Sequence, residues 1–292
     1  MILIGENLNV MSRLVGEAFK KREPQPVRAM VEAEVRAGVD LIELNIGPAR
    51  KGGREFMEWL VNLVQDVTDL PLSLDTTNME AMEAGLAVCR NKALINSISA
   101  RPERITKLMP LAKKYGASFI GLTLGLEGIP RDVNERGLFA AEIIAAAAAI
   151  GIPEENIWLD PLILPVNTQQ MQLQGCLEFI MMLKDLSPYC KSTCGISNVS
   201  NGVPKTLRGI LNRTYLIMVK RYGMYSAIVD AFDKELYDIA KGKMPGLEAL
   251  VHRAMDGEEP DVAALSKEEA DYVKTTRVLL NRTLYSDSWL DL

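Results

Sequence analysis

Carboxylates and carboxamides recur at the ends of short apolar segments of this sequence, where apolar residues would pack better. In "CGISNVSNG", residues 194–202, Asn198 follows such a segment. Asn45 and Asn96 lie within apolar runs, where an unpaired polar group costs about 1–3 kcal/mol, so we expect both to have hydrogen-bonding partners. The full set of polar residues at segment ends is Glu6, Asn7, Asn9, Asn45, Asp75, Asn96, Asp160, Asn198 and Asp230.

The chemistry of this polar set depends on whether its members converge. A single Asp or Asn has a structural explanation, because both residues cap helices and form turns. Together, carboxamides and carboxylates present donors and acceptors in fixed directions. That arrangement suits a flat heteroaromatic ligand whose edge alternates N–H and C=O groups.

Metal and nucleophile chemistry have little support in the sequence. The only histidine is His252, and Cys190 and Cys194 form an isolated pair. Zinc sites draw most of their ligands from Cys and His, and nucleophilic triads need a histidine beside the nucleophile. We therefore expect no metal site and no Ser/His/Asp or Cys/His nucleophile.

The strands and helices that must position the polar set can be predicted from the alternation of two kinds of sequence pattern. Short β-branched runs alternate with stretches of helical periodicity, which is typical of βα units around a parallel sheet. Eight units in about 240 residues predict an α/β protein with a (β/α)8 fold, the TIM barrel. A doubly wound open sheet is the competing fold, but the Gly-rich phosphate turn that it needs is missing from "IGENLN". The predicted strands are residues 2–6, 41–46, 71–75, 93–98, 118–124, 157–161, 193–198 and 226–231.

The C-terminal strand ends of a (β/α)8 barrel form one mouth, where binding and catalysis take place. The polar set should therefore meet at this mouth.

Between and after the strands, helical periodicity predicts helices over residues 26–37, 54–67, 78–90, 102–115, 134–150, 170–186, 205–222 and 233–241.

We expect a single domain over residues 1–292, with one interruption near its end. Residues 242–266 are rich in Gly, Pro and acidic residues, which predicts a surface insertion. A helix from Lys267 to about Leu284 is expected to close the barrel. In the tail, Trp289 and Leu290 are expected to pack on the body of the protein.

Composition limits the partners. The 292 residues are 48% hydrophobic, carry a net charge of −5 and lack a long Lys/Arg cluster, so we expect no nucleic acid partner. The start "MILIGENLNV" lacks signal-peptide features, and Glu142 interrupts the longest apolar run, so no membrane span is expected. Four scattered cysteines do not form a disulfide framework, and we expect a cytoplasmic protein.

A series of motifs resembles a known family. In chain order they are "GENLN", "ELNIGPA", "LSLDTTN", "INSIS", "GLTL", "LDPLILPVN", "GISNVSNG", "LNRTY" and "MYSAIVDA". Together they resemble the methyltetrahydrofolate:corrinoid methyltransferases over nearly the whole chain, apart from residues 242–266. The resemblance implies a pterin-binding (β/α)8 barrel, usually a homodimer, related to the folate domain of cobalamin-dependent methionine synthase and more distantly to dihydropteroate synthases.

The resemblance also implies roles for particular residues. Asp75, Asn96 and Asp160 match the family residues that hold the edge of the pterin ring, without a metal ion. Asn198, in "SNVS", matches the catalytic asparagine that hydrogen-bonds N5, the atom that carries the methyl group. A methyl group on a tertiary amine leaves readily only when the nitrogen is protonated, and a carboxamide can serve both protonation states.

Downstream of this motif, "SNGVPKTLRGI" is slightly longer than the usual loop of the family. The resemblance assigns Asn201 and Arg208 in this loop to the p-aminobenzoate portion of folate. Because the chain has no separate domain for a corrinoid, the cobalamin is expected on a partner protein that docks at the barrel mouth. The insertion favours the subgroup that moves methyl groups from a methylcob(III)alamin protein to tetrahydrofolate, as in glycine betaine demethylation. The opposite direction, from methyltetrahydrofolate to a corrinoid iron-sulfur protein, is the alternative.

Two further readings compete. Dihydropteroate synthases share the barrel and pterin pocket, but that family has a Ser-x-Arg at the end of strand eight, which receives pyrophosphate. Here "SAIVDAF" puts Asp230 at that end, which disfavours this reading. The other is a non-catalytic scaffold that binds a pterin or corrinoid, and the presence of Asn198 argues against it.

Overall fold

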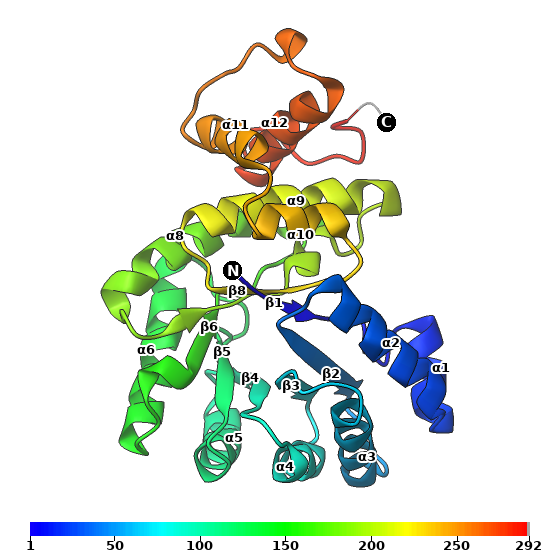
Figure 1. Cartoon of the computed structure of the whole chain (residues 1–292). Helices are drawn as coiled ribbons and strands as arrows, with labels where there is room; N and C mark the ends of the chain where they lie inside the picture. Colours follow the sequence, from blue (N-terminus) through cyan, green and yellow to red (C-terminus); the bar gives the residue numbers. More distant parts are fainter. Residues whose placement is uncertain (291–292) are drawn as a thin grey trace.

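The computed structural model describes residues 1–290, and its centre is a ring of eight parallel strands with helices outside it (Figure 1). Neighbouring strands follow chain order from β1 to β7, and β8 pairs with β1. The predicted (β/α)8 barrel is therefore confirmed. The strands are β1 (Ile2–Gly5), β2 (Leu41–Gly47), β3 (Leu72–Thr76), β4 (Leu94–Ser99), β5 (Ser118–Leu122), β6 (Ile157–Asp160), β7 (Lys191–Ser192) and β8 (Ser226–Val229).

The seventh strand differs from the prediction. The sequence predicts a strand over residues 193–198, and this is wrong, because β7 ends at Ser192 and a 3-10 helix, η2 (Ile196–Ser200), follows. Serine and asparagine favour such turns because their short side chains hydrogen-bond to nearby backbone, as Ser200 Oγ does to the Ser197 carbonyl over 3.2 Å. A bridge between Gly195 and Ile228 joins this segment to β8.

Helices alternate with the strands, and polar caps fix where several of them begin. The Asn78 side chain accepts hydrogen bonds from the Glu80 and Ala81 amides, and Asp132 accepts one from Glu135. The helices that connect or follow the strands are α1 (Arg13–Lys21), α2 (Pro24–Ala37), α3 (Gly53–Gln65), α4 (Met79–Val88), α5 (Pro102–Lys114), α6 (Val133–Ala149), α7 (Val166–Gln169), α8 (Gln172–Leu186), α9 (Lys205–Arg221) and α10 (Lys234–Ala240).

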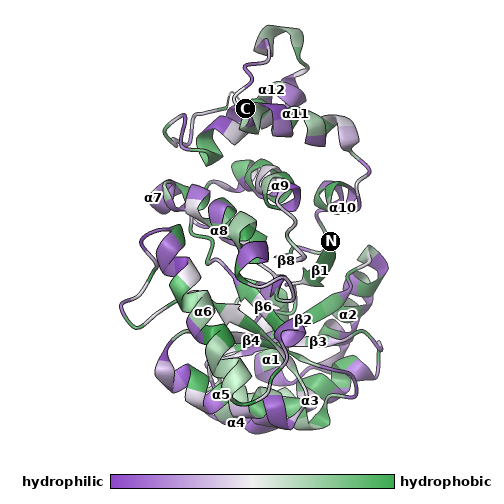
Figure 2. Cartoon of the chain, turned by 90° about the vertical axis from the view of Figure 1, so that its left-hand side faces the viewer, coloured by the Kyte–Doolittle hydropathy of each residue, from purple (hydrophilic) through white to green (hydrophobic). Residues whose placement is uncertain are grey.

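Two helices lie beyond the ring, α11 (Pro245–Met255) and α12 (Lys267–Leu279). The prediction that a helix over residues 267–284 closes the barrel is wrong, because α12 ends at Leu279 and packs on α9 and α11 (Figures 1 and 2). The strands close the ring themselves: β8 pairs with β1, and the Gly195–Ile228 bridge joins β8 to the segment after β7. The tail packs as predicted: Leu290 is buried, and Trp289 Nε1 donates to Thr275 Oγ1 over 3.1 Å.

Apolar side chains fill the barrel in two layers, and a small separate cluster lies between α11 and α12. The larger cluster lies between strands and helices, and hydrophobic residues of the strands colour the centre of Figure 2 green. A smaller cluster contains the alternate strand residues, which point to the opposite face of the strands, the interior of the ring. Its buried members are Ile4, Leu41, Leu94, Ile120, Trp158 and Ile228. This interior layer, the apolar plug, fills the barrel and supports the side chains that lie above it, toward the C-terminal strand ends.

Candidate active site

A polar layer lies directly above the apolar plug. Side chains two positions apart on a strand point to the same face. Two positions after plug residues on five of the strands, the chain has Glu6, Glu43, Asn96, Asp160 and Asp230. The sequence therefore fills the interior with apolar residues at one level and with acids and an amide at the next.

The two asparagines inside strands have the partners that the sequence analysis required. Asn45 Nδ2 donates to Asp75 Oδ2 over 2.5 Å, and the two residues are in register on β2 and β3. Asn96 Nδ2 donates to Glu43 Oε1 over 2.6 Å. Asp75 and Asn96 are also in register, on β3 and β4, so these four side chains form one amide and carboxyl cluster.

Burial changes the acidity of this cluster. Glu43 is 4% exposed, and its burial together with the nearby Asp75 charge raises its pKa well above the usual range. Burial raises the pKa of Asp75 to about 6, against the opposing effects of the Asn45 hydrogen bond and the Arg104 charge. Two carboxyl groups this close repel each other's charge, which favours a state in which one of them is protonated.

Asp160 ends β6 in a similar environment. Its Oδ1 accepts a hydrogen bond from the Leu162 amide over 2.8 Å, in a tight turn where Leu162 has a φ of 62°. Burial raises the pKa of Asp160 to about 7, although the hydrogen bond and the charge of Arg136 act in the opposite direction. Near neutral pH this carboxyl group can therefore accept or donate a proton.

Asn198 lies in η2 and lines a cavity of about 670 Å³. Asn201 and Arg208, the other two residues predicted near it, line the same cavity. Asn198 packs closely over Gly195, because a Cβ added at Gly195 would lie 3.1 Å from Asn198 Nδ2. The residues around the cavity are Glu6, Asn7, Asn9, Met11, Ser12, Met30, Ser197, Asn198, Asn201, Arg208 and Asp230.

The predicted site residues thus fall into two groups. Asn198, Asn201 and Arg208 surround the cavity, whereas Asp75, Asn96 and Asp160 lie on β3, β4 and β6 and are not among its lining residues. The polar layer connects the groups, because the charges of both Asp75 and Glu6 act on Glu43.

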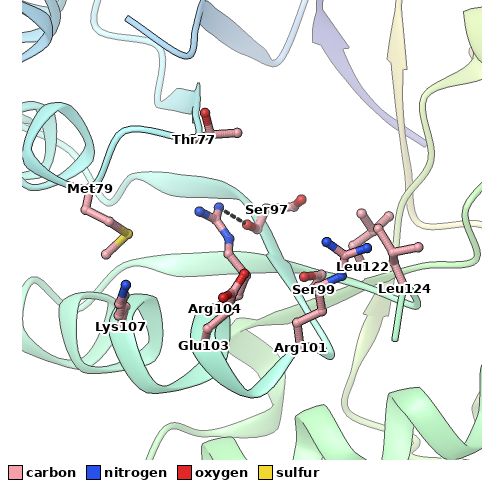
Figure 3. A pocket seen from close by; sticks show the side chains of 10 residues that line it. All are labelled: Thr77, Met79, Ser97, Ser99, Arg101, Glu103, Arg104, Lys107, Leu122 and Leu124. Atoms are coloured by element: carbon pink, nitrogen blue, oxygen red, sulfur yellow. Dashed lines mark hydrogen bonds between the residues drawn. The ribbon is translucent and has the colours of Figure 1, made fainter. Parts of the chain in front are cut away.

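A second cavity, of about 470 Å³, opens beside β4 and β5, and the sequence analysis did not find it (Figure 3). Three cations from the start of α5 line it, Arg101, Arg104 and Lys107. Arg104 extends toward β4 and donates from Nη2 to the Ser97 carbonyl over 3.0 Å. The Arg104 charge lowers the pKa of Asp75, so this cavity adjoins the amide and carboxyl cluster.

Two buried acids were missed by the sequence analysis. The burial of Glu43 was predictable from the sequence, because Glu43 interrupts the apolar run "LIELNI" on the same strand face as Asn45. The burial of Glu34 was not predictable, because a glutamate on a charged helix is usually exposed. Its carboxyl group lies against Gly5, where an added Cβ would come within 2.9 Å of Glu34 Cδ.

Within residues 1–290, no three Asp, Glu, His or Cys side chains are grouped so that they could hold a metal ion. The described part of the chain also contains no helix with the length and apolarity needed to cross a membrane. Burial raises the pKa of Cys176 to about 11 and that of Cys194 well above the usual range, which makes both thiols poor nucleophiles.

Fold and site together define a (β/α)8 barrel with a layer of amides and carboxyl groups at its mouth. Residues 5–230 match the family described as pterin binding enzyme, and the chain belongs to that family.

Two individual proteins and one solved structure are similar to this chain. The chain is 25% identical over 238 residues to a methylcorrinoid:tetrahydrofolate methyltransferase of Eubacterium limosum, which covers 81% of this chain and 87% of that protein. It is 28% identical over 242 residues to a methionine synthase of Mycobacterium leprae, which covers 79% of this chain but 20% of that protein. A crystal structure of dihydropteroate synthetase with a product has a TM-score of 0.60 at 18% identity, over 84% of this chain and 94% of that one. This last likeness concerns the fold alone.

Proposed function

We propose that this enzyme is a methyltransferase that moves a methyl group between N5 of tetrahydrofolate and the cobalt of a corrinoid carried by a partner protein. The observation that carries the proposal is the cavity at the mouth, where Asn198 lies next to a layer of amides and weakly acidic carboxyl groups. The family match and the names of the bacterial relatives support it.

Asp75, Asn96 and Asp160 are proposed to hold the edge of the pterin ring. A pterin edge alternates ring N–H, amino and carbonyl groups, and it needs acceptors and donors in fixed positions. Two carboxyl groups whose pKa values are raised to about 6 and about 7, with an oriented carboxamide between their strands, match that requirement. No metal ion is needed for this recognition.

Asn198 is proposed to act on N5 as the catalytic residue. Its carboxamide oxygen accepts from protonated N5, and its NH2 group donates to neutral N5, so a rotation of the side chain serves both states. The corrinoid supplies the cobalt that releases or accepts the methyl group. Asn201 and Arg208 are proposed to contact the p-aminobenzoate portion of folate, since they line the same cavity as Asn198.

For the direction, we propose methylcob(III)alamin as donor and tetrahydrofolate as acceptor, as in the demethylation of substrates such as glycine betaine. The Eubacterium limosum relative supports this direction by its name, and the match covers most of both chains. The opposite direction, with methyltetrahydrofolate as donor and a corrinoid iron-sulfur protein as acceptor, is the alternative.

The corrinoid protein is proposed to dock over the mouth. Exposed apolar side chains in the loops that follow β1, β5 and β6 support a contact surface there: Met11, Leu126 and Met171 are 86%, 75% and 77% exposed. The contact should be transient, because the corrinoid must also meet a second methyltransferase. A homodimer and a cytoplasmic location stay predictions.

Dihydropteroate synthase remains the remote alternative. Its reaction expels pyrophosphate, which requires cations at the end of strand eight. In this chain Asp230 follows β8, and its Oδ1 accepts hydrogen bonds from Asn7 Nδ2 over 2.8 Å and from the Phe232 amide over 3.0 Å. A carboxylate in this position disfavours a pyrophosphate site.

The experiment that tests the function follows the cobalt spectrum of chelator-treated protein. One sample contains methylcobalamin and tetrahydrofolate, and the other contains cob(I)alamin and methyltetrahydrofolate. The proposal predicts a spectral change in the first mixture. A change in the second mixture alone would reverse the direction, and no change in either, with bound folate established by calorimetry, would contradict methyl transfer.

A further inference from the structure

A group that exchanges the N5 proton has to lie in the same cavity as Asn198, because Asn198 itself does not titrate. Glu6 is a titratable carboxyl group in that cavity, and it projects inward from the end of β1. Ser197, the residue before Asn198, donates from Oγ to Glu6 Oε2 over 2.9 Å. Glu6 is thereby tied to the turn that carries Asn198.

Glu6 belongs to a group of three carboxyls around Asn7. The Asn7 backbone N–H donates to Glu34 Oε1 over 2.9 Å, and Asn7 Nδ2 of the side chain donates to Asp230 Oδ1 over 2.8 Å. The charge of Asp230 acts on both Glu6 and Glu34. Three negative charges this close repel one another, so the group favours states in which one carboxyl is protonated.

The environment of Glu34 independently indicates that this group of three carboxyls favours a protonated state. Its side chain is fully buried behind β1, and its Oε2 has no hydrogen-bonding partner among the described residues. A buried, unpaired carboxylate oxygen is costly, and protonation removes the charge. The pKa of Glu34 is raised to about 7, chiefly by burial and also by the charges of Asp230 and Glu6, although the Asn7 hydrogen bond lowers it.

We propose that Glu6 is a catalytic residue that takes the proton from N5 when tetrahydrofolate is methylated and returns it in the reverse reaction. This inference rests on the proposed methyl transfer. The N5 lone pair forms the bond to the methyl carbon, and the carbon–cobalt bond breaks with its electron pair left on cobalt. The proton on N5 then passes to the Glu6 carboxylate, which completes the balance.

Several groups face Glu6 and set its acidity. Burial raises the pKa of Glu6, the Ser197 hydrogen bond lowers it, the Asp230 charge raises it and the Arg208 charge lowers it. Glu34 and Glu43 also lie close enough to feel the Glu6 charge. Substitutions at Asp230 and Ser197 should therefore move the acidity of Glu6 in opposite directions.

The test measures the pH dependence of single-turnover methyl transfer from methylcobalamin to saturating tetrahydrofolate. For the wild-type protein the rate should rise with pH as Glu6 ionises. Asp230→Asn should shift this rise to lower pH, because it removes a like charge. Ser197→Ala should shift it to higher pH, because it removes a hydrogen bond to the carboxylate. Glu6→Gln should lower the rate by about 10²–10⁴-fold and abolish the rise.

Glu32→Gln is the matched control, since it makes the same change on the exposed face of α2, where Glu32 pairs with Arg36 at 3.6 Å. Its pH profile should equal that of the wild type. Tetrahydrofolate binding and melting temperature of Glu6→Gln establish that the variant is folded. A Glu6→Gln protein with the wild-type rate and profile, or shifts in the same direction for Asp230→Asn and Ser197→Ala, would overturn the role of Glu6 alone. A wild-type protein that transfers no methyl group in either direction would overturn the proposed function.

Discussion

The acidity of Asp160 should control how tightly the protein binds folate. Burial raises the pKa of this carboxyl group to about 7. If Asp160 accepts a hydrogen bond from the pterin ring, binding requires the ionised form, and below about pH 7 the proton must first be removed. The affinity for tetrahydrofolate should then weaken by up to about tenfold per pH unit as the pH falls below 7.

Calorimetric titration of tetrahydrofolate between about pH 5.5 and about pH 8 measures this effect. Asp160→Asn should bind more weakly at high pH and show little of this dependence, because the amide does not titrate. A wild-type dissociation constant that stays level across the range would mean that the ligand does not depend on a hydrogen bond to ionised Asp160.

Single residues were predictable where an apolar run made a polar side chain conspicuous. Asn45 and Asn96 were expected to need partners, and Asp75 and Glu43 provide them. Glu43 was visible in the same run but was not assigned a role. Glu34 was not predictable, because its burial depends on the tertiary contact between α2 and Gly5 of β1.

At the scale of elements, the close packing of η2 should govern the position of Asn198. A Cβ at Gly195 would lie 3.1 Å from Asn198 Nδ2, tighter than an ordinary contact, and Gly195 has a φ of −81° that alanine tolerates. Gly195→Ala should therefore displace the carboxamide and lower the methyl transfer rate about tenfold or more, with little loss of stability.

Single-turnover rates and melting temperatures measure the two effects. Gly246→Ala in α11 is the matched control, because a Cβ there meets no atom within 4 Å and α11 lies outside the ring. It should leave the rate unchanged. A Gly195→Ala protein that transfers methyl groups at the wild-type rate would show that the contact does not position Asn198.

Most of the alternating strands and helices followed from hydrophobic periodicity, whereas helix α1 was not predicted and the bounds of two further elements were wrong. The run over residues 193–198 is apolar enough for a strand, but the hydrogen bond from the Ser200 side chain to the Ser197 backbone favours a turn. The pattern of α12 is amphipathic, and amphipathicity alone does not say which surface a helix covers. It packs on α9 and α11 rather than on the strands.

For the whole molecule, the unit of α11 and α12 should contribute to stability without affecting catalysis. Lys220 Nζ of α9 pairs with Glu248 of α11 at 2.8 Å, with both side chains largely buried. Glu248→Ala leaves Lys220 short of a partner and should lower the free energy of unfolding by about 1–3 kcal/mol. The methyl transfer rate should not change, because the pair lies outside the ring and away from the mouth.

Urea unfolding measures this loss, with Glu258→Ala as the control. Glu258 pairs with Arg253 at 3.9 Å, and both side chains are more than half exposed, so its removal should cost less than about 0.5 kcal/mol. If Glu248→Ala reduced methyl transfer while leaving stability intact, the unit of α11 and α12 would have a functional rather than a stabilising role.

The most direct measurement of the central claim is the single-turnover rate of methyl transfer in Asn198→Ala, together with its affinity for tetrahydrofolate. Asn198 is exposed at the cavity and makes no side-chain hydrogen bond that the folded state depends on among the described residues. If its carboxamide acts on N5, the rate should fall by about 10²–10³-fold while stability stays close to that of the wild type. Asn134→Ala, on the exposed surface of α6, should leave the rate unchanged. An Asn198→Ala protein that binds tetrahydrofolate and transfers the methyl group at the wild-type rate would contradict the account.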